Sequence, residues 1–156
     1  MNSSVSREAP GVRLRAATAT DREFARQLHH AGMRWLGERL HGKWDHAVQD
    51  ARFKQKFVLE EVRVIVADEE DAGYLQTADV GGEVVLKELH ITEAFQNRGI
   101  GTEVLRMLLA EARRTAKPVA VTVVKFNPAV AFYERAGFRI VSEQDQYRYF
   151  LRHQNQ

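Results

Sequence analysis

The stretch from Gln96 to Thr102 reads QNRGIGT and places two glycines and an arginine directly before a predicted helix. The first backbone N–H groups of a helix have no partner inside the helix, and the helix dipole attracts anions to this end. Glycine lets a phosphate approach the backbone closely, and Arg98 adds a positive charge beside it. The stretch is therefore either a phosphate-binding loop or an ordinary turn. It lacks the third glycine of a dinucleotide fingerprint and the Gly-Lys-Ser/Thr ending of a Walker loop.

A carboxylate and an imidazole, Glu88 and His90, lie two residues apart in the predicted strand before this loop. Alternation along a strand places both on one face, where either group is a candidate base for removing a proton from a reacting amine. A β-bulge in the strand would shift this parity. The alternative interpretation makes Glu88 a partner in a cross-strand ion pair.

Another candidate group lies in NPAVAFYERAGF, from Asn127 to Phe138. Proline favours the first position of a helix and asparagine favours the capping position before it, so Asn127 and Pro128 predict the start of a short helix. Tyr133 on that helix is either a proton-bearing phenol in a site or an aromatic side chain of the core.

The chain resembles the GNAT family of N-acetyltransferases. QNRGIG, from Gln96 to Gly101, matches the family's Q/R-x-x-G-x-G/A signature, and NPAVAFYERAGF is similar to its second signature. LRAATATD near the start also resembles the family's first strand and helix start, so the likeness covers most of the chain. One departure is Glu93, which stands where the family commonly has a proline.

This resemblance implies acetyl-coenzyme A as the cofactor, with its pyrophosphate on the backbone N–H groups of the glycine loop. It implies that the strands ending at Ile91 and near Val124 splay apart and receive the pantetheine arm. It also implies a bulge near His90 and Ile91, whose backbone N–H groups hold the developing oxyanion. The cofactor-binding residues implied in this way are His90, Ile91, Gln96, Asn97, Arg98, Gly99, Ile100, Gly101, Thr102, Asn127 and Tyr133.

The resemblance further implies that Tyr133 is the general acid that protonates the departing thiolate. Ordinary phenol and thiol pKa values of about 10 and 8.5 differ by only about 2 kcal/mol, which suits a transfer concerted with C–S cleavage. For the base we predict Glu88 ahead of His90. The chain contains no cysteine, which agrees with direct attack by the amine and no covalent acetyl-enzyme.

The acceptor pocket of this fold is usually lined by the N-terminal helices, here MRWLGERLHGKWDH from Met33 to His46. Trp35 and Trp44 predict an aromatic wall, and Glu38 and Asp45 would receive a small cationic amine. The alternatives are that the tryptophans belong to the core and that the charged residues form a solvated helix face. Histidines are frequent in this region, but no H-E-x-x-H pattern accompanies them, so we predict no metal site.

Hydrophobic periodicity predicts the elements that position these residues. A strongly apolar strand from Glu83 to Ile91 is expected at the centre of the sheet, and a long amphipathic helix is expected from Gly99 to Thr115. The other predicted strands are 12–18, 62–69, 72–80, 119–124, 138–141 and 147–151, and the other predicted helices are 21–40, 44–57 and 127–137. This order predicts an α+β (α/β sandwich) fold of the GNAT type. Its mixed, mostly antiparallel sheet has six to seven strands, with helices beside it and a splayed parallel pair at its centre.

Composition sets the remaining expectations. We predict a flexible leader over residues 1–10 and one acetyltransferase domain over residues 11–156. The net charge of +2 gives no reason to expect nucleic-acid binding, and no apolar run is long enough for a membrane span or a secretory signal, which favours a cytoplasmic location. The expected partner is a small-molecule amine or a peptide, and the resemblance allows a homodimer. Protein N-terminal acetylation and a non-catalytic CoA-binding regulatory module are the alternatives.

Overall fold

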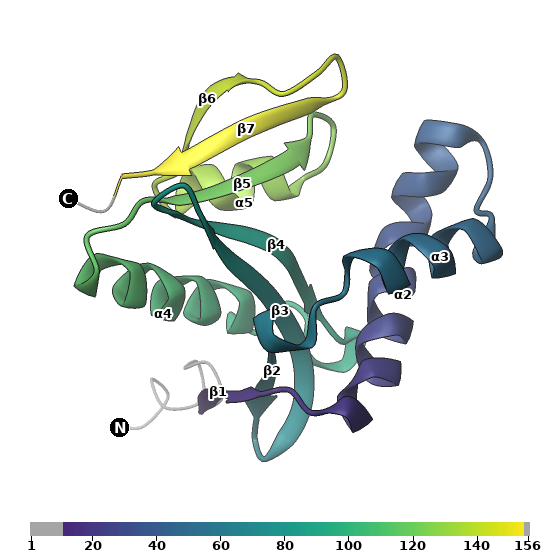
Figure 1. Cartoon of the computed structure of the whole chain (residues 1–156), viewed down its shortest axis with the longest axis horizontal. Helices are drawn as coiled ribbons and strands as arrows, with labels where there is room; N and C mark the ends of the chain where they lie inside the picture. Colours follow the sequence, from purple (N-terminus) through teal and green to yellow (C-terminus); the bar gives the residue numbers. More distant parts are fainter. Residues whose placement is uncertain (1–10, 155–156) are drawn as a thin grey trace.

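The structure, a computed structural model, describes residues 11–154 and forms a single seven-stranded sheet with helices on both faces (Figure 1). Its elements are β1 (Val12–Ala16), α2 (Arg22–His41), α3 (His46–Lys56), β2 (Val62–Ala67), β3 (Glu70–Val80), β4 (Glu83–Ile91), α4 (Ile100–Arg114), β5 (Val119–Val124), α5 (Ala129–Arg135), β6 (Arg139–Glu143) and β7 (Arg148–His153). Three single-turn helices precede α2, β2 and the glycine loop. The predicted elements are all present, with ends that differ by a few residues.

The strand order in the sheet is β1-β2-β3-β4-β5-β7-β6, so β4 is the central strand, as its apolar sequence predicted. Every neighbouring pair is antiparallel except β4 and β5. The parallel pairing joins only Val84 to Val119 and Val85 to Ala120. Beyond these residues the two strands separate, which confirms the predicted splay and opens the sheet at its centre.

A β-bulge in β4 decides which side chains face which side of the sheet. Leu86 pairs with Thr77 of β3 and Glu88 pairs with Gln76, so Lys87 is the extra residue. Because one inserted residue reverses the alternation, the apolar residues before and after the bulge pack in the same core while Glu88 and His90 face the other side. The bulge was expected near His90 and Ile91, and that expectation was wrong by about three residues.

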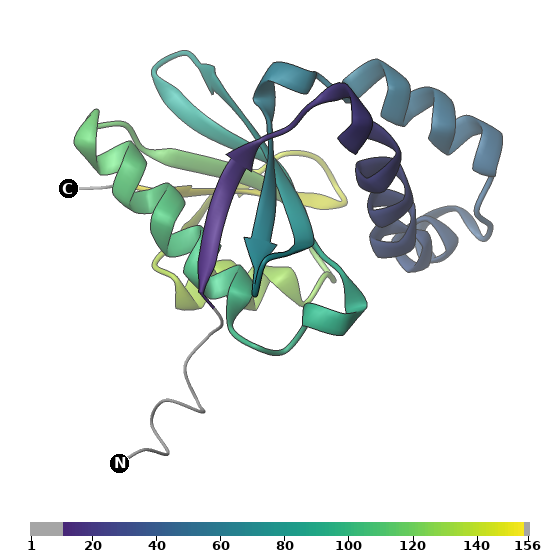
Figure 2. The ribbon, with the colours of Figure 1, turned by 90° about the horizontal axis from the view of Figure 1, so that it is seen from below.

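Two hydrophobic cores lie on the two faces of the sheet. The larger lies under α4 and α5, and the α4 residues buried in it are those of the predicted apolar stripe, Ile100, Val104, Leu105, Leu108 and Ala112. The smaller core lies under α2 and α3 and contains Ala25, Phe53, Val62 and Tyr74. Figure 2 shows α4 and the α2–α3 pair on opposite sides of the sheet.

The predicted leader, residues 1–10, lies outside the described residues, as do the last two residues of the predicted domain. None of the helices in the described part of the chain has the length and apolar character needed to cross a membrane.

Candidate active site

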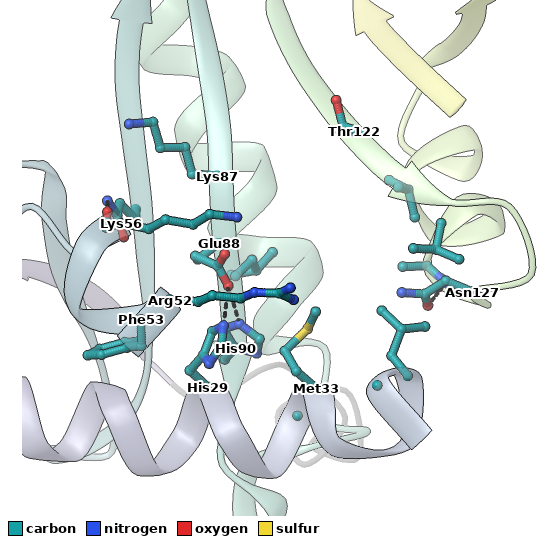
Figure 3. Close-up of a pocket in the computed structure, with 18 of the residues that line it drawn as sticks. His29, Met33, Arg52, Phe53, Lys56, Lys87, Glu88, His90, Thr122 and Asn127 are labelled. Carbon is teal, nitrogen blue, oxygen red and sulfur yellow. Dashed lines mark hydrogen bonds and ion pairs between the residues drawn. The ribbon is translucent and has the colours of Figure 1, made fainter. Parts of the chain in front are cut away.

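A cavity of about 550 Å³ lies where β4 and β5 separate. The strands contribute residues 86–90 and 121–124, α5 contributes Tyr133, and α2 and α3 form the wall on the opposite side (Figure 3). The absence of backbone pairing between the strands beyond Val85 and Ala120 creates this space. The two catalytic residues predicted from the sequence, Glu88 and Tyr133, both line it.

Glu88 is hydrogen-bonded by one imidazole and lies near a second. His90 Nε2 lies 2.7 Å from Glu88 Oε1, and His29 Nε2 of α2 approaches the same oxygen to 3.8 Å (Figure 3). All three side chains are largely buried. Burial lowers the pKa of His29 to about 4, although the charge of Glu88 acts in the opposite direction, so His29 is neutral near pH 7. Among residues 11–154, Glu88 thus has no lysine or arginine partner of the kind that the cross-strand alternative required.

Tyr133 approaches the cavity from α5, and its ring packs against Phe132 and Phe138. Its hydroxyl has no hydrogen-bond partner among residues 11–154. Burial, with a smaller contribution from the charge of Glu88, raises the pKa of this phenol. The side chain is therefore protonated at neutral pH and its hydroxyl is available to a ligand in the cavity.

Asn127 lies two residues before α5 and lines the cavity (Figure 3). Its side-chain Oδ1 accepts a hydrogen bond of 2.9 Å from the backbone N–H of Ala129, which confirms the predicted capping role. The cap fixes the side chain, because the amide oxygen is committed to the helix. The amide nitrogen is then the group that Asn127 can offer to a ligand.

The glycine loop ends in the first turn of α4. Asn97 and Gly99 both have a positive φ, of 62° and 79°, and Glu103 is the first residue whose N–H bonds back to Gly99. The N–H groups of residues 100–102 therefore precede the hydrogen-bond ladder of the helix. The side chain of Gln96 donates a 3.0 Å hydrogen bond to the carbonyl of Ile91, which ties the loop to the end of β4.

Gly101 provides a direct test of whether the loop fits a phosphate. A Cβ at this position would lie 3.7 Å from the ring of Phe132, which is an ordinary van der Waals contact. Its φ is not positive, so neither the packing nor the backbone of the protein requires a glycine here. The missing Cβ leaves room for a ligand to approach the helix end closely, and a pyrophosphate would fit this space.

Arg98 does not lie free at the edge of this loop. Its guanidinium contacts Asp68 at 3.2 Å and lies over the ring of Phe95, and both members of the ion pair are well exposed. An exposed pair of this kind exchanges readily with solvent and ions. Arg98 is therefore positioned to contact an anion at the loop, in competition with Asp68.

The four residues predicted for the acceptor pocket divide into two groups. Trp35 and Trp44 line the cavity, and Trp35 is still 42% exposed. Glu38 and Asp45 are not among the lining residues. Glu38 contacts Arg34 at 3.5 Å on the exposed side of α2, and Asp45 caps α3 by accepting a hydrogen bond from the N–H of Val48.

The charged residues that line the cavity on the side of α2 and α3 were not predicted from the sequence. Arg52 and Lys56 project from α3, and Lys87 projects from the bulge of β4, although Lys87 is paired with Glu61 at 2.9 Å (Figure 3). Helical periodicity in α3 identifies the buried face but gives no information about which strand the exposed face meets. His29 was missed for the same reason. Among the described residues no group of three or more histidine, aspartate or glutamate side chains could hold a metal ion.

The known protein family with this arrangement is found by sequence comparison. The profile of the acetyltransferase (GNAT) domain matches residues 20–155 of the chain. The chain belongs to the GNAT acetyltransferase family. It is accordingly an acetyl-CoA-dependent N-acetyltransferase, and acetyl-CoA is its acetyl donor, as the sequence predicted.

Solved structures share the GNAT fold over nearly the whole chain. The PaiA N-acetyltransferase of Thermoplasma acidophilum in complex with coenzyme A is 14% identical, with a TM-score of 0.74, and the match covers 92% of this chain and 99% of that one. An acetyltransferase of Thermus thermophilus is 20% identical, with a TM-score of 0.71, and 93% and 97% of the two chains are covered. Ard1 of Thermoplasma volcanium is 15% identical, with a TM-score of 0.63 and coverage of 90% and 95%. No curated protein sequence matches the chain.

Proposed function

We propose that this GNAT enzyme acetylates a primary amine of a small molecule, and that the amine attacks directly within a ternary complex. The observation that carries the proposal is that Glu88 and Tyr133 line the same cavity from β4 and α5. The charge of Glu88 contributes to the raised pKa of Tyr133, so the two groups interact electrostatically across the splay. A base and an acid are therefore available on the two sides of one reaction space.

Glu88 accepts the proton of the attacking amine in this proposal. The hydrogen bond from His90 Nε2 fixes the carboxylate, and His29 Nε2 lies on its other side at 3.8 Å. A fixed base needs no reorientation when the amine arrives, which favours proton removal in the transition state. His90 acts as a positioning residue because it holds Glu88 through one ring nitrogen.

Tyr133 donates its proton to the departing sulfur. The raised pKa keeps the phenol protonated, and it also widens the difference of about 2 kcal/mol that ordinary phenol and thiol values give. Complete proton transfer from the phenol to a fully formed thiolate is therefore more unfavourable than the ordinary pKa values indicate. The donation must accompany C–S cleavage, with the hydroxyl first stabilising the growing negative charge as a hydrogen-bond donor.

Acetyl-CoA supplies an acetyl group on a thioester, and the residues that would hold it are those around the splay and the glycine loop. The N–H groups of residues 100–102 and the side chain of Arg98 suit its pyrophosphate. The amide nitrogen of Asn127 and the backbone of His90 and Ile91 suit the amides of its pantetheine arm. The missing Cβ of Gly101 supports this assignment.

The wall on the acceptor side supports a small molecule in preference to a protein N-terminus. Trp44 and Phe53 line the cavity from the region of α2 and α3, and Trp35 extends the same aromatic surface. Aromatic walls of this kind enclose small ligands and leave little room for an extended chain. The experiment below therefore compares small amines with peptide acceptors.

The test is an acceptor screen that follows the free thiol of released coenzyme A with amines and with short peptides. We expect thiol release with at least one small primary amine and a 10²–10⁴-fold lower kcat in Tyr133→Phe with little change in acetyl-CoA affinity. Tyr147→Phe is the matched control, because this tyrosine is 51% exposed and lies outside the cavity wall. Unchanged turnover in Tyr133→Phe, or turnover with peptides alone, would refute the corresponding part of the proposal.

A further inference from the structure

The charges that line the acceptor side of the cavity are mostly positive. Arg52 and Lys56 of α3 extend into the cavity (Figure 3), and within residues 11–154 neither side chain has an ion-pair or hydrogen-bond partner. Most other arginines of the described chain are paired, including Arg15, Arg26 and Arg152. Glu88 is the one carboxylate among the described lining residues. The cavity thus presents a base beside two uncompensated cations.

We propose that the acceptor amine carries an anionic group, a carboxylate or a phosphate, which Arg52 and Lys56 bind. The inference rests on the proposed acetyl transfer and names its substrate class. A guanidinium binds either anion through two parallel hydrogen bonds, and a lysine adds a third contact to the same group. A diamine would instead bring a second ammonium group next to two cations, which is unfavourable.

This substrate class replaces the cationic acceptor that the sequence suggested. That expectation depended on Glu38 and Asp45, and neither residue lines the cavity. Arg52 and Lys56 belong to α3, which packs on the opposite face of the sheet from α4 and its glycine loop (Figure 2), so the phosphates of the cofactor do not need them. The amine of the acceptor would point to Glu88 and its anionic group to α3.

The test compares amino acids, aminoalkyl phosphates, amino carboxamides and diamines of matched chain length in the thiol-release assay. We expect the anionic amines to give the highest kcat/KM. In Arg52→Gln we expect their KM to rise about ten- to a hundredfold while the KM for acetyl-CoA stays unchanged. Lys54→Gln is the matched control, since Lys54 is exposed on the same helix but does not line the cavity.

The outcomes separate this inference from the function on which it depends. Thiol release that is fastest with diamines, or an Arg52→Gln variant with an unchanged KM for anionic amines, would overturn the inference and leave acetyl transfer intact. Preference for amino acids over aminoalkyl phosphates, or the reverse, identifies the anion. Absence of thiol release with every amine and peptide would remove both proposals.

A second observation is a row of two imidazoles, His29 and His30, between Glu88 and the protein surface. His29 Nε2 lies 3.8 Å from Glu88 Oε1, and His29 Nδ1 lies 3.0 Å from His30 Nδ1. His30 Nε2 lies 2.7 Å from Asp50 Oδ1. His29 and His30 are buried, whereas Asp50 is 39% exposed and also contacts Arg26 and His46. The chain therefore crosses the layer formed by α2 and α3.

We infer that His29 and His30 conduct the proton of the acceptor amine from Glu88 to Asp50 and on to solvent. Acetylation of an ammonium group by a thioester yields an amide, a thiol and one proton, so one proton must leave the site in each turnover. Bound acceptor and cofactor would exclude water from the direct route. The imidazole chain provides an exit that stays in place while the cavity is filled.

The contacts assign a proton to each nitrogen. A carboxylate only accepts, so His30 donates from Nε2 to Asp50, and His30 Nδ1 then accepts from His29 Nδ1. This leaves a lone pair on His29 Nε2 facing Glu88. A proton that arrives there moves the Nδ1 proton to His30, and His30 releases its Nε2 proton to Asp50. After product release, solvent returns a proton through Asp50 to His30 Nε2, the Nδ1 proton of His30 passes back to His29 Nδ1, and water in the open cavity takes the Nε2 proton of His29. These three transfers restore the first arrangement, and each turnover has released one proton.

The charged groups around this chain favour movement of the proton outward. His29 faces Glu88, His90, His30 and Lys56, and its buried position lowers its pKa to about 4, so the proton does not remain there. At the far end the hydrogen bond from His30, together with Arg26 and His46, lowers the pKa of Asp50, so a proton that reaches this exposed carboxylate passes on to solvent.

The test is His30→Phe, which keeps an aromatic ring against Trp44, His46 and Phe53 but removes both nitrogens. We expect kcat to fall by about tenfold or more, KM for both substrates to stay unchanged, and added imidazole to restore part of kcat in the variant only. An unchanged kcat, or a loss that imidazole does not rescue in a folded protein, would overturn the inference. If His30→Phe does not fold, Asp50→Asn is measured with the same readouts, and an unchanged kcat in that variant would overturn the inference.

Discussion

Gly32→Ala is predicted to lower activity without destabilising the protein. Gly32 lies in α2 where the helix meets His90 of β4, and a Cβ there would lie 2.7 Å from His90 Nδ1. Ordinary contacts between such atoms are about 3.5 Å, so the ring must move by nearly 1 Å. The hydrogen bond of 2.7 Å from His90 to Glu88 would then stretch beyond its normal range. A misplacement of about 1 Å in an active site lowers the rate by about 10²-fold.

The free energy of unfolding of Gly32→Ala should rise or stay unchanged although its activity falls. Alanine is favoured over glycine inside a helix by about 0.5–1 kcal/mol, which offsets the cost of moving the His90 ring. Measuring kcat by thiol release together with the midpoint of thermal unfolding separates the two effects. A lower kcat with an unchanged or higher midpoint is the expected pair of results.

Gly37→Ala is the comparison variant for this experiment. It makes the same substitution in the same helix, but its Cβ would meet Trp44 at 3.0 Å and not His90. We therefore expect it to change the KM of the acceptor more than kcat. A Gly32→Ala protein that folds and retains the wild-type kcat would refute the role given to His90 in holding Glu88.

Three further predictions concern the cofactor loop, acid stability and pH dependence. Gly101→Ala should weaken coenzyme A binding in calorimetric titration without lowering the thermal midpoint, and unchanged affinity would contradict phosphate contact at the loop. Asp21→Asn should reduce the free energy of unfolding at pH 7 by about 2 kcal/mol, because the bidentate ion pair with Arg15 lowers the pKa of Asp21 to about 2. This contribution to the free energy of unfolding is present above pH 4 and is lost as the pH falls toward 2. If the wild type and the variant lost equal stability over that range, the role given to the ion pair would be contradicted. Since burial lowers the pKa of His29 from 6.5 to about 4, the unfolded chain binds more protons between these values. Denaturant titrations should show stability falling by about 3 kcal/mol as the pH drops from 6.5 to 4, and His29→Phe should remove most of this slope.

The elements that build the site were predictable because their signals are local. The apolar stripe of α4 repeats at helical spacing, and the strands alternate or form short apolar runs between turn residues. Gly99 and Asn127 act within one or two residues of their own position, as a positive-φ residue before α4 and as a cap of α5. Such roles depend on backbone geometry that a short segment determines by itself.

The acceptor side was less predictable because its residues meet only after α2 and α3 pack on the sheet. Glu38 and Asp45 are acidic residues of the kind that suits an amine. However, Glu38 pairs with Arg34 on α2 and Asp45 caps α3, and neither side chain lines the cavity. Arg52 and Lys56 were overlooked because a solvated helix face and the wall of a cavity have the same composition. Only the packing of the helix distinguishes these two environments.

The sequence by itself determined the family, the order of the strands and helices, and acetyl-CoA as the donor. The signatures around Gly101 and Tyr133 are continuous segments, so the family can be identified without knowledge of distant contacts. The tertiary structure decided which way Glu88 and His90 face, because one bulged residue, Lys87, reverses the alternation of β4. It also decided which helix residues surround Glu88, since α2 and α3 reach the cavity only through long-range packing. The charge of the acceptor pocket and the imidazole chain to Asp50 follow from that packing.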